Sequence, residues 1–168
     1  MEEYLEAVLY AYPLLKRTEE TYGECIKNKA LLSYRSSKPA EAVAEAIANE
    51  ILEKENLLWL KERVERMTDK LSEGERSLLA LRFFGKGAKM KKSTLDKLER
   101  EQVLGKELSQ RQYFRILNRV GEKAASMLVA EGVTRELYEE KFSKVELLKK
   151  IGVWLRRMRG GKLGETVT

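Results

Sequence analysis

The chain has 168 residues, 43% of them hydrophobic and only 2 of them proline, a composition typical of one compact helical domain with an extended helical part. It contains no histidine and one cysteine, Cys25, which excludes Cys/His zinc sites, histidine-based nucleophilic triads and a disulfide framework within the chain. The formal net charge is +6, with eleven Lys and Arg against five Asp and Glu in residues 86–123, and seven against one in residues 144–162.

Residues 1–71 predict two long helices that form a hairpin. From Tyr4 to about residue 33, apolar side chains recur at three- and four-residue spacings, as in an amphipathic helix. Pro13 falls inside this run and is expected to kink or interrupt it, because proline has no N–H to donate. Residues 36–39 form the break, and Pro39 suits the start of a second helix that runs to Leu71.

The second helix is expected to turn one apolar side inward. The residues on this side are Val43, Ala46, Ile47, Ile51, Leu58, Val64, Met67 and Leu71. Because two helices cover only one side of each other, the hairpin serves either as scaffold or as a surface for a partner or a second copy of the chain. Trp59 and Leu60 add to the apolar surface and favour the second possibility.

Residues 71–85 predict a short capped helix. Ser72 and Glu75 have the spacing of a capping box, in which the hydroxyl and the carboxylate each bond a free backbone N–H. The buried side comprises either Leu78, Leu81 and Phe84 or Leu79 and Phe83, and Gly85 is a suitable stop.

Residues 86–108 predict a basic loop followed by a middle helix over 93–104. Lys86, Lys89, Lys91 and Lys92 lie in the loop, and such a run is either a solvated segment or a set of phosphate contacts. We expect Lys89, Lys91 and Lys92 to contact phosphate if the helix that begins at Ser109 reads DNA.

A further capped helix begins at Ser109. Tyr113, Leu117, Val120 and Ala124 recur at spacings of four, three and four, which places them on one buried face. The polar residues left outside this face are Gln110, Arg111, Gln112, Arg115, Asn118 and Arg119. Arg pairs with guanine, Gln and Asn pair with adenine, and any Arg can neutralise a phosphate, so the outer face is either a DNA-reading surface or an ordinary solvated face.

Residues 71–128 resemble region 4, the C-terminal helix-turn-helix domain of sigma-70-type bacterial sigma factors. The resemblance rests on Leu71-Ser72, Glu75-Arg76 and Leu81-Arg82-Phe83-Phe84, and on Ser109 with the run from Arg111 to Arg115. It is closest to the small sigma-like proteins of phages and integrated elements in Gram-positive bacteria. The resemblance implies binding to promoter DNA and to a flap of the RNA polymerase core. The connection over 86–108 is longer than is usual in the family, which predicts a wider turn.

The C-terminal part predicts helices over 134–142 and 143–159, ended by Gly160-Gly161. Val145, Leu148, Ile151, Leu155 and Met158 form an apolar stripe with Trp154 beside it, and the other side is basic through Lys149, Lys150, Arg156, Arg157 and Arg159. Such a helix could lie on an acidic membrane surface, but docking on the helical core, with the basic side toward DNA or polymerase, is more economical.

Together these patterns predict an all-α protein: a helical hairpin (1–71), a region 4-like helix-turn-helix domain (72–131), C-terminal helices (132–160) and a flexible tail (161–168). The expected function is a non-enzymatic, sequence-specific DNA-binding transcription regulator without a cofactor or metal, with RNA polymerase as a further partner by resemblance. The alternative is a helical adaptor for another protein, in which the helix-turn-helix is only structural. With an acidic N-terminus and no apolar run of about 20 residues, we expect a cytoplasmic location without a membrane partner.

Overall fold

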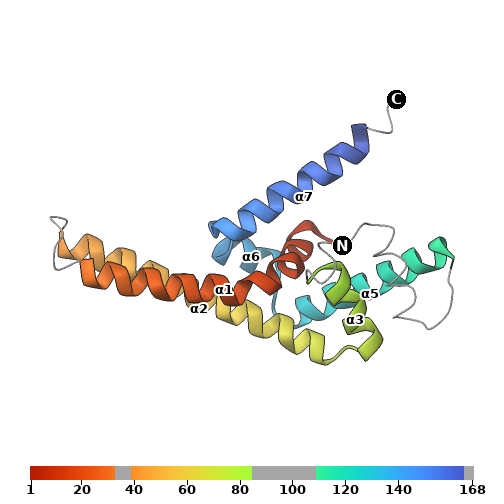
Figure 1. The fold of residues 1–168 in the computed structure, drawn as a ribbon, viewed down its shortest axis with the longest axis horizontal. Helices are drawn as coiled ribbons and strands as arrows, with labels where there is room; N and C mark the ends of the chain where they lie inside the picture. The colour runs from red at the N-terminus through yellow and green to blue at the C-terminus, as the bar shows by residue number, and fades with distance from the viewer. Residues whose placement is uncertain (33–38, 85–108, 165–168) are drawn as a thin grey trace.

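A computed structural model describes residues 1–32, 39–84 and 109–164 of the chain. The described residues form six helices and no strand, as Figure 1 shows: α1 (Glu3–Leu32), α2 (Ala40–Asp69), α3 (Glu73–Arg82), α5 (Gln110–Ala130), α6 (Arg135–Lys141) and α7 (Glu146–Gly164). The prediction of an all-α protein is therefore confirmed. The predicted middle helix over 93–104 and the stop at Gly85 lie outside the described residues.

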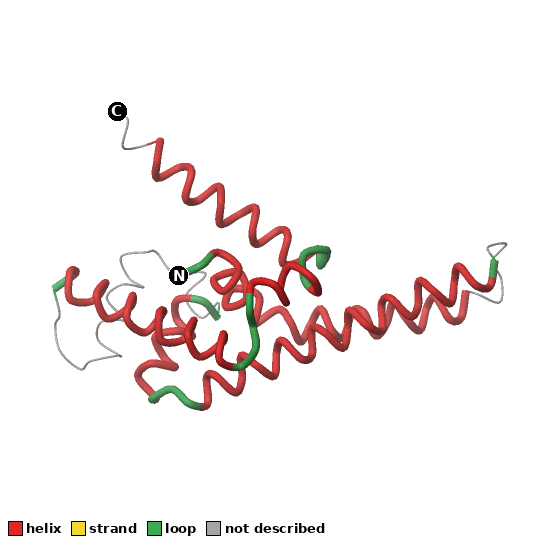
Figure 2. The backbone as a smooth tube through the Cα atoms, turned by 180° about the vertical axis from the view of Figure 1, so that it is seen from behind, coloured by secondary structure: helices red, strands yellow, loops and turns green. Residues whose placement is uncertain are grey.

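The two longest helices, α1 and α2, lie side by side and run in opposite directions in both views of the molecule (Figures 1 and 2). Their inner parts join the other helices, whereas their outer parts project away from them. We call residues 18–32 and 40–58 the arm. Burial follows this division, because the buried side chains of α2 are Leu57, Leu60, Val64 and Met67, all at or beyond the inner end of the arm.

Pro13 does not interrupt α1, contrary to one of the two outcomes expected from the sequence. The helix is continuous from Glu3 to Leu32, with Pro13 exposed on its outer side. The first turns, drawn in the darkest red, are tilted away from the long run that follows (Figure 1). A kink without a break fits the chemistry, because proline deprives the Leu9 carbonyl of its usual partner but still fits helical φ.

One hydrophobic core joins the inner ends of the helices. Its largest fully buried side chains come from five of the six described helices and the residue that ends α6: Tyr113, Phe142, Leu9, Leu15, Leu57, Leu60, Met67, Leu78, Leu79, Leu128 and Leu148. Each such side chain contributes about 1.5–3 kcal/mol through its removal from water. The core therefore holds α5 by one face and leaves its other face at the surface.

Helix α3 starts at the predicted capping box. Ser72 Oγ accepts a bond from the Glu75 backbone N–H at 3.3 Å, and the Glu75 carboxylate accepts one from the Ser72 N–H at 3.1 Å. Burial opposes ionisation of Glu75, but hydrogen bonds from Ser72 and Lys123 outweigh it and lower the pKa of this carboxyl. Leu78 and Leu79 of α3 and Phe83, the residue that caps it, are buried, a mixture of the two sets expected from the sequence.

Helix α7 packs on α1, as the apolar stripe predicts. Leu148 and Leu155 are 2% and 4% exposed, and the Trp154 ring meets the edge of Tyr10 at 5.1 Å between centroids. Two expectations are wrong: Met158 is 53% exposed, and α7 runs through Gly160-Gly161 to Gly164. The glycine pair does not end the helix, because a Gly in a helix interior costs only about 1 kcal/mol relative to Ala.

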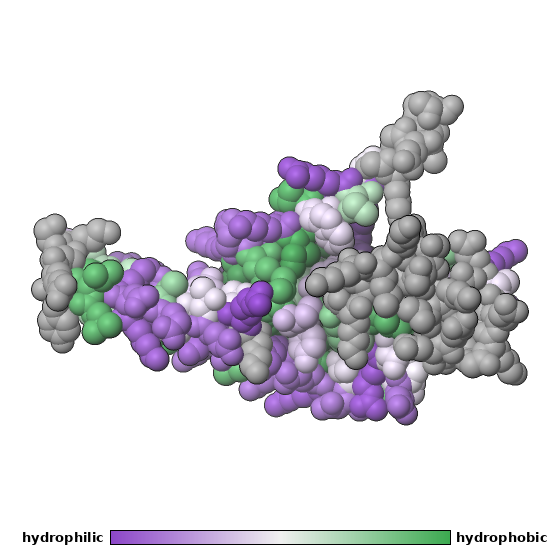
Figure 3. Space-filling model, in the orientation of Figure 1, coloured by the Kyte–Doolittle hydropathy of each residue, from purple (hydrophilic) through white to green (hydrophobic). Residues whose placement is uncertain are grey.

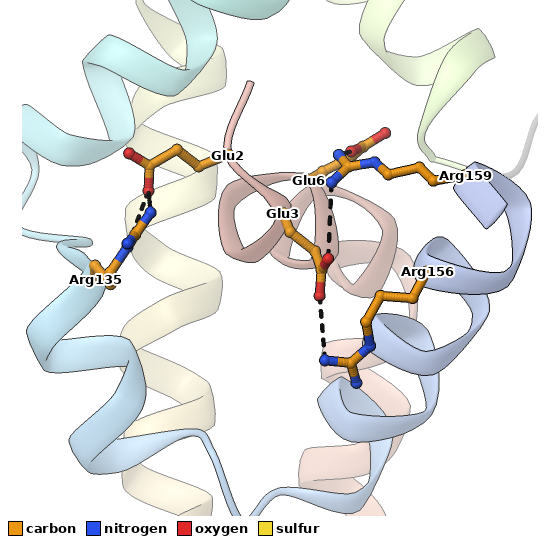
Figure 4. A network of polar contacts seen from close by, with 6 residues as sticks. All are labelled: Glu2, Glu3, Glu6, Arg135, Arg156 and Arg159. Carbon is orange, nitrogen blue, oxygen red and sulfur yellow. Dashed lines mark hydrogen bonds and ion pairs between the residues drawn. The ribbon is translucent and has the colours of Figure 1, made fainter. Parts of the chain in front are cut away.

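Ion pairs tie the first turns of α1 to α6 and α7 (Figure 4). Arg156 lies 3.6 Å from Glu3, Arg159 bonds Glu6, and Arg135 bonds Glu2 at 2.8 Å. Arg156 and Arg159 therefore do not belong to a free basic side of α7, contrary to the sequence expectation. Lys149, Lys150 and Arg157 remain exposed on its outer side.

The inward side of α2 is only partly as expected. Val64, Met67 and Leu71 are buried, but Ile51 and Leu58 are 42% and 36% exposed. The two side chains expected to add exposed apolar surface do not do so. Leu60 is fully buried, and Trp59 is half-buried between Phe142 and the Arg63 guanidinium, which lies 4.9 Å from its ring.

Nowhere in the described ranges is a helix both long and apolar enough to span a membrane.

Candidate nucleic-acid interface

The surface singled out by the sequence begins at a well-defined helix start. Ser109 has extended backbone angles, and its Oγ accepts a hydrogen bond from the Gln112 backbone N–H at 3.3 Å. The Gln112 side-chain oxygen accepts in return from the Ser109 N–H at 3.2 Å. This reciprocal cap fixes the first turn of α5 and therefore the direction in which the next side chains project.

The two faces of α5 differ as predicted. Tyr113, Leu117, Val120 and Ala124 are all buried, with Leu117 the most exposed at 8%. Leu128 continues the same face into the core with no exposure. Because this side is held along the whole helix, the opposite side is presented on a rigid support.

Three arginines follow one another along the opposite side. Arg111, Arg115 and Arg119 are exposed and stand four residues apart, so each lies about 6 Å further along the helix axis than the last. No carboxylate of the described residues lies within ion-pair distance of any of them. These three guanidinium groups, none paired with a carboxylate of the described residues, lie within about 12 Å and form a row suited to phosphates or base edges.

The two predicted glutamines differ from the arginines. Gln112 is exposed, but its side-chain oxygen is engaged by the Ser109 N–H and hydroxyl, so it could pair with adenine only by giving up the cap. The side chain of Gln110 lies outside the described residues, as do the predicted phosphate contacts Lys89, Lys91 and Lys92.

Asn118 is exposed at the edge of the outer face. It lines a cleft where α1, α5 and α7 meet the end of α3, together with Tyr10, Arg82 and Phe83. Burial, only partly offset by Arg82, raises the pKa of the Tyr10 phenol, which therefore stays neutral. Because Asn118 lines this cleft, it points less directly away from the protein than the arginine row does.

Glu122 is a residue of this face that the sequence reasoning missed. It lies seven residues after Arg115, a spacing that returns to the same side of a helix, and this signal was available in the sequence. Its carboxylate lies 3.0 Å from the amine of Met1, which compensates its charge. The arginine row therefore keeps a net positive charge.

Replacing Ser109 by Ala is expected to loosen the first turn of α5 and to cost about 1 kcal/mol. Hydrogen exchange should show faster exchange at the amides of Arg111 and Gln112, because the Gln112 N–H loses its acceptor. Ser72→Ala, which removes the equivalent box of α3, is the matched control and should leave these amides unchanged. Unaltered exchange in Ser109→Ala would contradict a cap that orders the arginine row.

The described residues contain no group of three Cys, Asp or Glu side chains placed to hold a metal ion. No protein-family model, curated protein or solved structure matches this chain.

Proposed function

We propose that this chain binds double-stranded DNA through the outer face of α5 and acts as a transcription regulator. The observation that carries the proposal is the row of Arg111, Arg115 and Arg119, exposed, without ion pairs to other described residues, and mounted on a capped helix whose other face lies in the core. Arginines spaced in this way on a surface helix match both the phosphates and the guanine edges of a major groove.

The remaining parts of the proposal rest on other observations. The basic residues concentrated in 86–123 favour a polyanionic partner over a neutral one. The resemblance to sigma region 4 supports promoter DNA as the target and the core of RNA polymerase as a second partner. A pull-down of core polymerase by the full chain tests the second partner separately from DNA.

Replacing Arg111 and Arg115 together by Ala is expected to abolish specific binding. Each lost base contact costs about 1–3 kcal/mol, and each lost phosphate contact lowers the slope of log K against log salt by about one. The target is first selected from a random duplex library with the wild-type chain. Affinities are then measured by fluorescence anisotropy at several salt concentrations, with the selected duplex and a scrambled one.

Arg17→Ala is the matched control for this experiment. Arg17 is an exposed arginine of α1, on the side of the molecule where the arm begins, and its removal lowers the net charge by the same amount per residue. Its loss should change neither specificity nor the salt slope. Equal binding by wild type and by Arg111→Ala/Arg115→Ala would show that α5 does not contact DNA.

The second candidate is a protein adaptor that binds its partner through the arm. It is favoured by exposed apolar side chains along the arm, where Leu31, Leu32 and Leu52 are 69%, 61% and 55% exposed. Failure of the library to yield any bound duplex, combined with capture of a protein partner that Leu31→Ser/Leu52→Ser abolishes, would favour the adaptor.

A further inference from the structure

The arm has a groove between its two helices that the DNA-binding proposal does not use. Ile26, Ile51 and Leu58 form its apolar part, and Gly23 opens its centre. Four charged residues border it: Glu19, Lys27, Lys54 and Glu55. Figure 3 shows the arm as a mixture of hydrophilic surface with hydrophobic patches, standing clear of the other described helices on this face.

Contacts between the helices show which residues stand level along the arm. Tyr12 bonds Glu65 in the helix pair just beyond the inner end of the arm, and Lys29 bonds Glu50 in its outer half. Between them, Lys54 Nζ lies 3.4 Å from the position that a Cβ on Gly23 would take. In each pair the two residue numbers add up to nearly the same value, as expected for two antiparallel helices with the same rise per residue.

The same register places the residues that border the groove. Glu19 stands level with Leu58 at the inner end of the groove, and Lys27 stands level with Ile51 at its outer end. The groove therefore has an acidic inner end and a basic outer end, with one apolar side chain beside each charge.

This arrangement is complementary to itself. Glu19 and Lys27 each lie four residues from Gly23, and Leu58 and Ile51 lie symmetrically about the neighbours Lys54 and Glu55. A two-fold axis crossing the arm at Gly23 would therefore place Glu19 against Lys27 of a second copy and Leu58 against Ile51 of that copy. Lys54 would face Glu55 of the second copy close to the axis, so that opposite charges meet throughout.

We propose that two copies of this chain associate through the groove, with the arms antiparallel and α1 of one copy lying along α1 of the other. The contact is isologous, since each pair occurs twice, and it joins two helical pairs into four packed helices. It covers Ile51 and Leu58, whose exposure a lone arm leaves unexplained. Glu19, Lys27, Lys54 and Glu55 form no ion pair with any residue in the described ranges of their own chain, so all four are available to the second copy.

Charge reversal tests this arrangement in the full chain by sedimentation velocity over a range of protein concentrations. The wild type should sediment as a dimer at high concentration. In a Glu19→Lys dimer, the new lysine of each copy would face Lys27 of the other, and in a Lys27→Glu dimer, the new glutamate of each copy would face Glu19 of the other. Because like charges then meet twice, the dissociation constant of each variant dimer should be about tenfold higher than that of wild type, or more. Circular dichroism should be unchanged, because both positions lie at the surface of the arm.

The decisive measurement mixes the two variants. The Glu19→Lys chain carries lysine at both ends of its groove, and the Lys27→Glu chain carries glutamate at both ends. Opposite charges therefore meet at both ends of a heterodimer, and a one-to-one mixture should recover wild-type association. Glu24→Lys, an exposed reversal on α1 outside the groove, is the control and should associate like wild type.

Three results would each overturn the proposal: a monomeric wild type, single variants that associate normally, or a mixture that associates no more tightly than its components. DNA binding by α5 is measured independently of these experiments. A failure of self-association would therefore leave the proposal of DNA binding untouched, and a failure of DNA binding would leave self-association untouched.

Discussion

Replacing Leu148 and Leu155 together by Asp is expected to lower the melting temperature of the whole protein by roughly 10 °C or more. Both side chains lie on the side of α7 that packs against α1 and are only 2% and 4% exposed. The change removes two buried leucines, each contributing about 1.5–3 kcal/mol, and would bury two carboxylates without partners. The combined loss approaches the total stability of a typical domain, about 5–15 kcal/mol. Thermal unfolding followed by circular dichroism measures the effect.

Val153→Asp is the control for this prediction. Val153 belongs to the same helix but is 41% exposed on its outer side, so Asp there should change the melting temperature little. Limited proteolysis adds a second reading, because a detached α7 should be cleaved early. An unchanged melting curve for the double variant, with α7 cleaved equally fast in both proteins, would show that α7 is not part of the core.

The local features of the fold were predictable because their physical causes are local. The capping box at Ser72 and the cap at Ser109 depend only on residues within one turn, and both form as predicted. The buried face of α5 follows from the helical period alone, and Tyr113 to Ala124 lie as expected. Docking of α7 followed from an apolar stripe that no nearby segment could cover.

What the sequence did not predict depends on contacts between distant segments. The helical period places Ile51 and Leu58 together and nearly opposite Met67 on α2, but it does not show which of the two sides meets the core. Arg159 pairs with Glu6 across 153 positions, and nothing in the pattern of α7 distinguishes it from Arg157, which stays exposed. Such long-range ion pairs depend on how the helices pack against one another, which the residue pattern of a single helix does not reveal.

The candidate interface shows the same division on a smaller scale. The arginine row was predictable from its four-residue spacing. Gln112 has two possible roles, because it is an outer residue and also stands three positions after Ser109, where a side chain can complete the cap, and in the structure it does so. The position of Asn118 at the edge of a cleft depends on Tyr10 and Arg82, which come from other helices. Sequence reasoning therefore identified the face but not the role of each side chain on it.

Replacing Phe142 by Ala is expected to destabilise the protein by about 3–5 kcal/mol, the cost of removing a large buried ring and leaving a cavity. Phe142 is fully buried at the end of α6. Its ring is stacked with that of Trp59 at 6.5 Å between centroids and lies 6.0 Å from that of Tyr138. Because α6 has only seven residues and no buried side chain of its own, we expect this ring to hold the helix against α2. Chemical denaturation gives the change in free energy of unfolding.

Two further measurements sharpen this prediction. Phe142→Leu keeps most of the buried volume and should cost less than Phe142→Ala, because the cavity it leaves is smaller. The chain has two tryptophans, so a Trp154→Phe background leaves Trp59 as the only fluorophore of its kind. In that background Phe142→Ala should shift the emission of the folded protein to longer wavelength, since water gains access to the Trp59 ring. Equal stability of the Ala and Leu variants and of wild type, with unshifted emission, would mean that α6 is held by Leu137 and Tyr138 without the Phe142 ring.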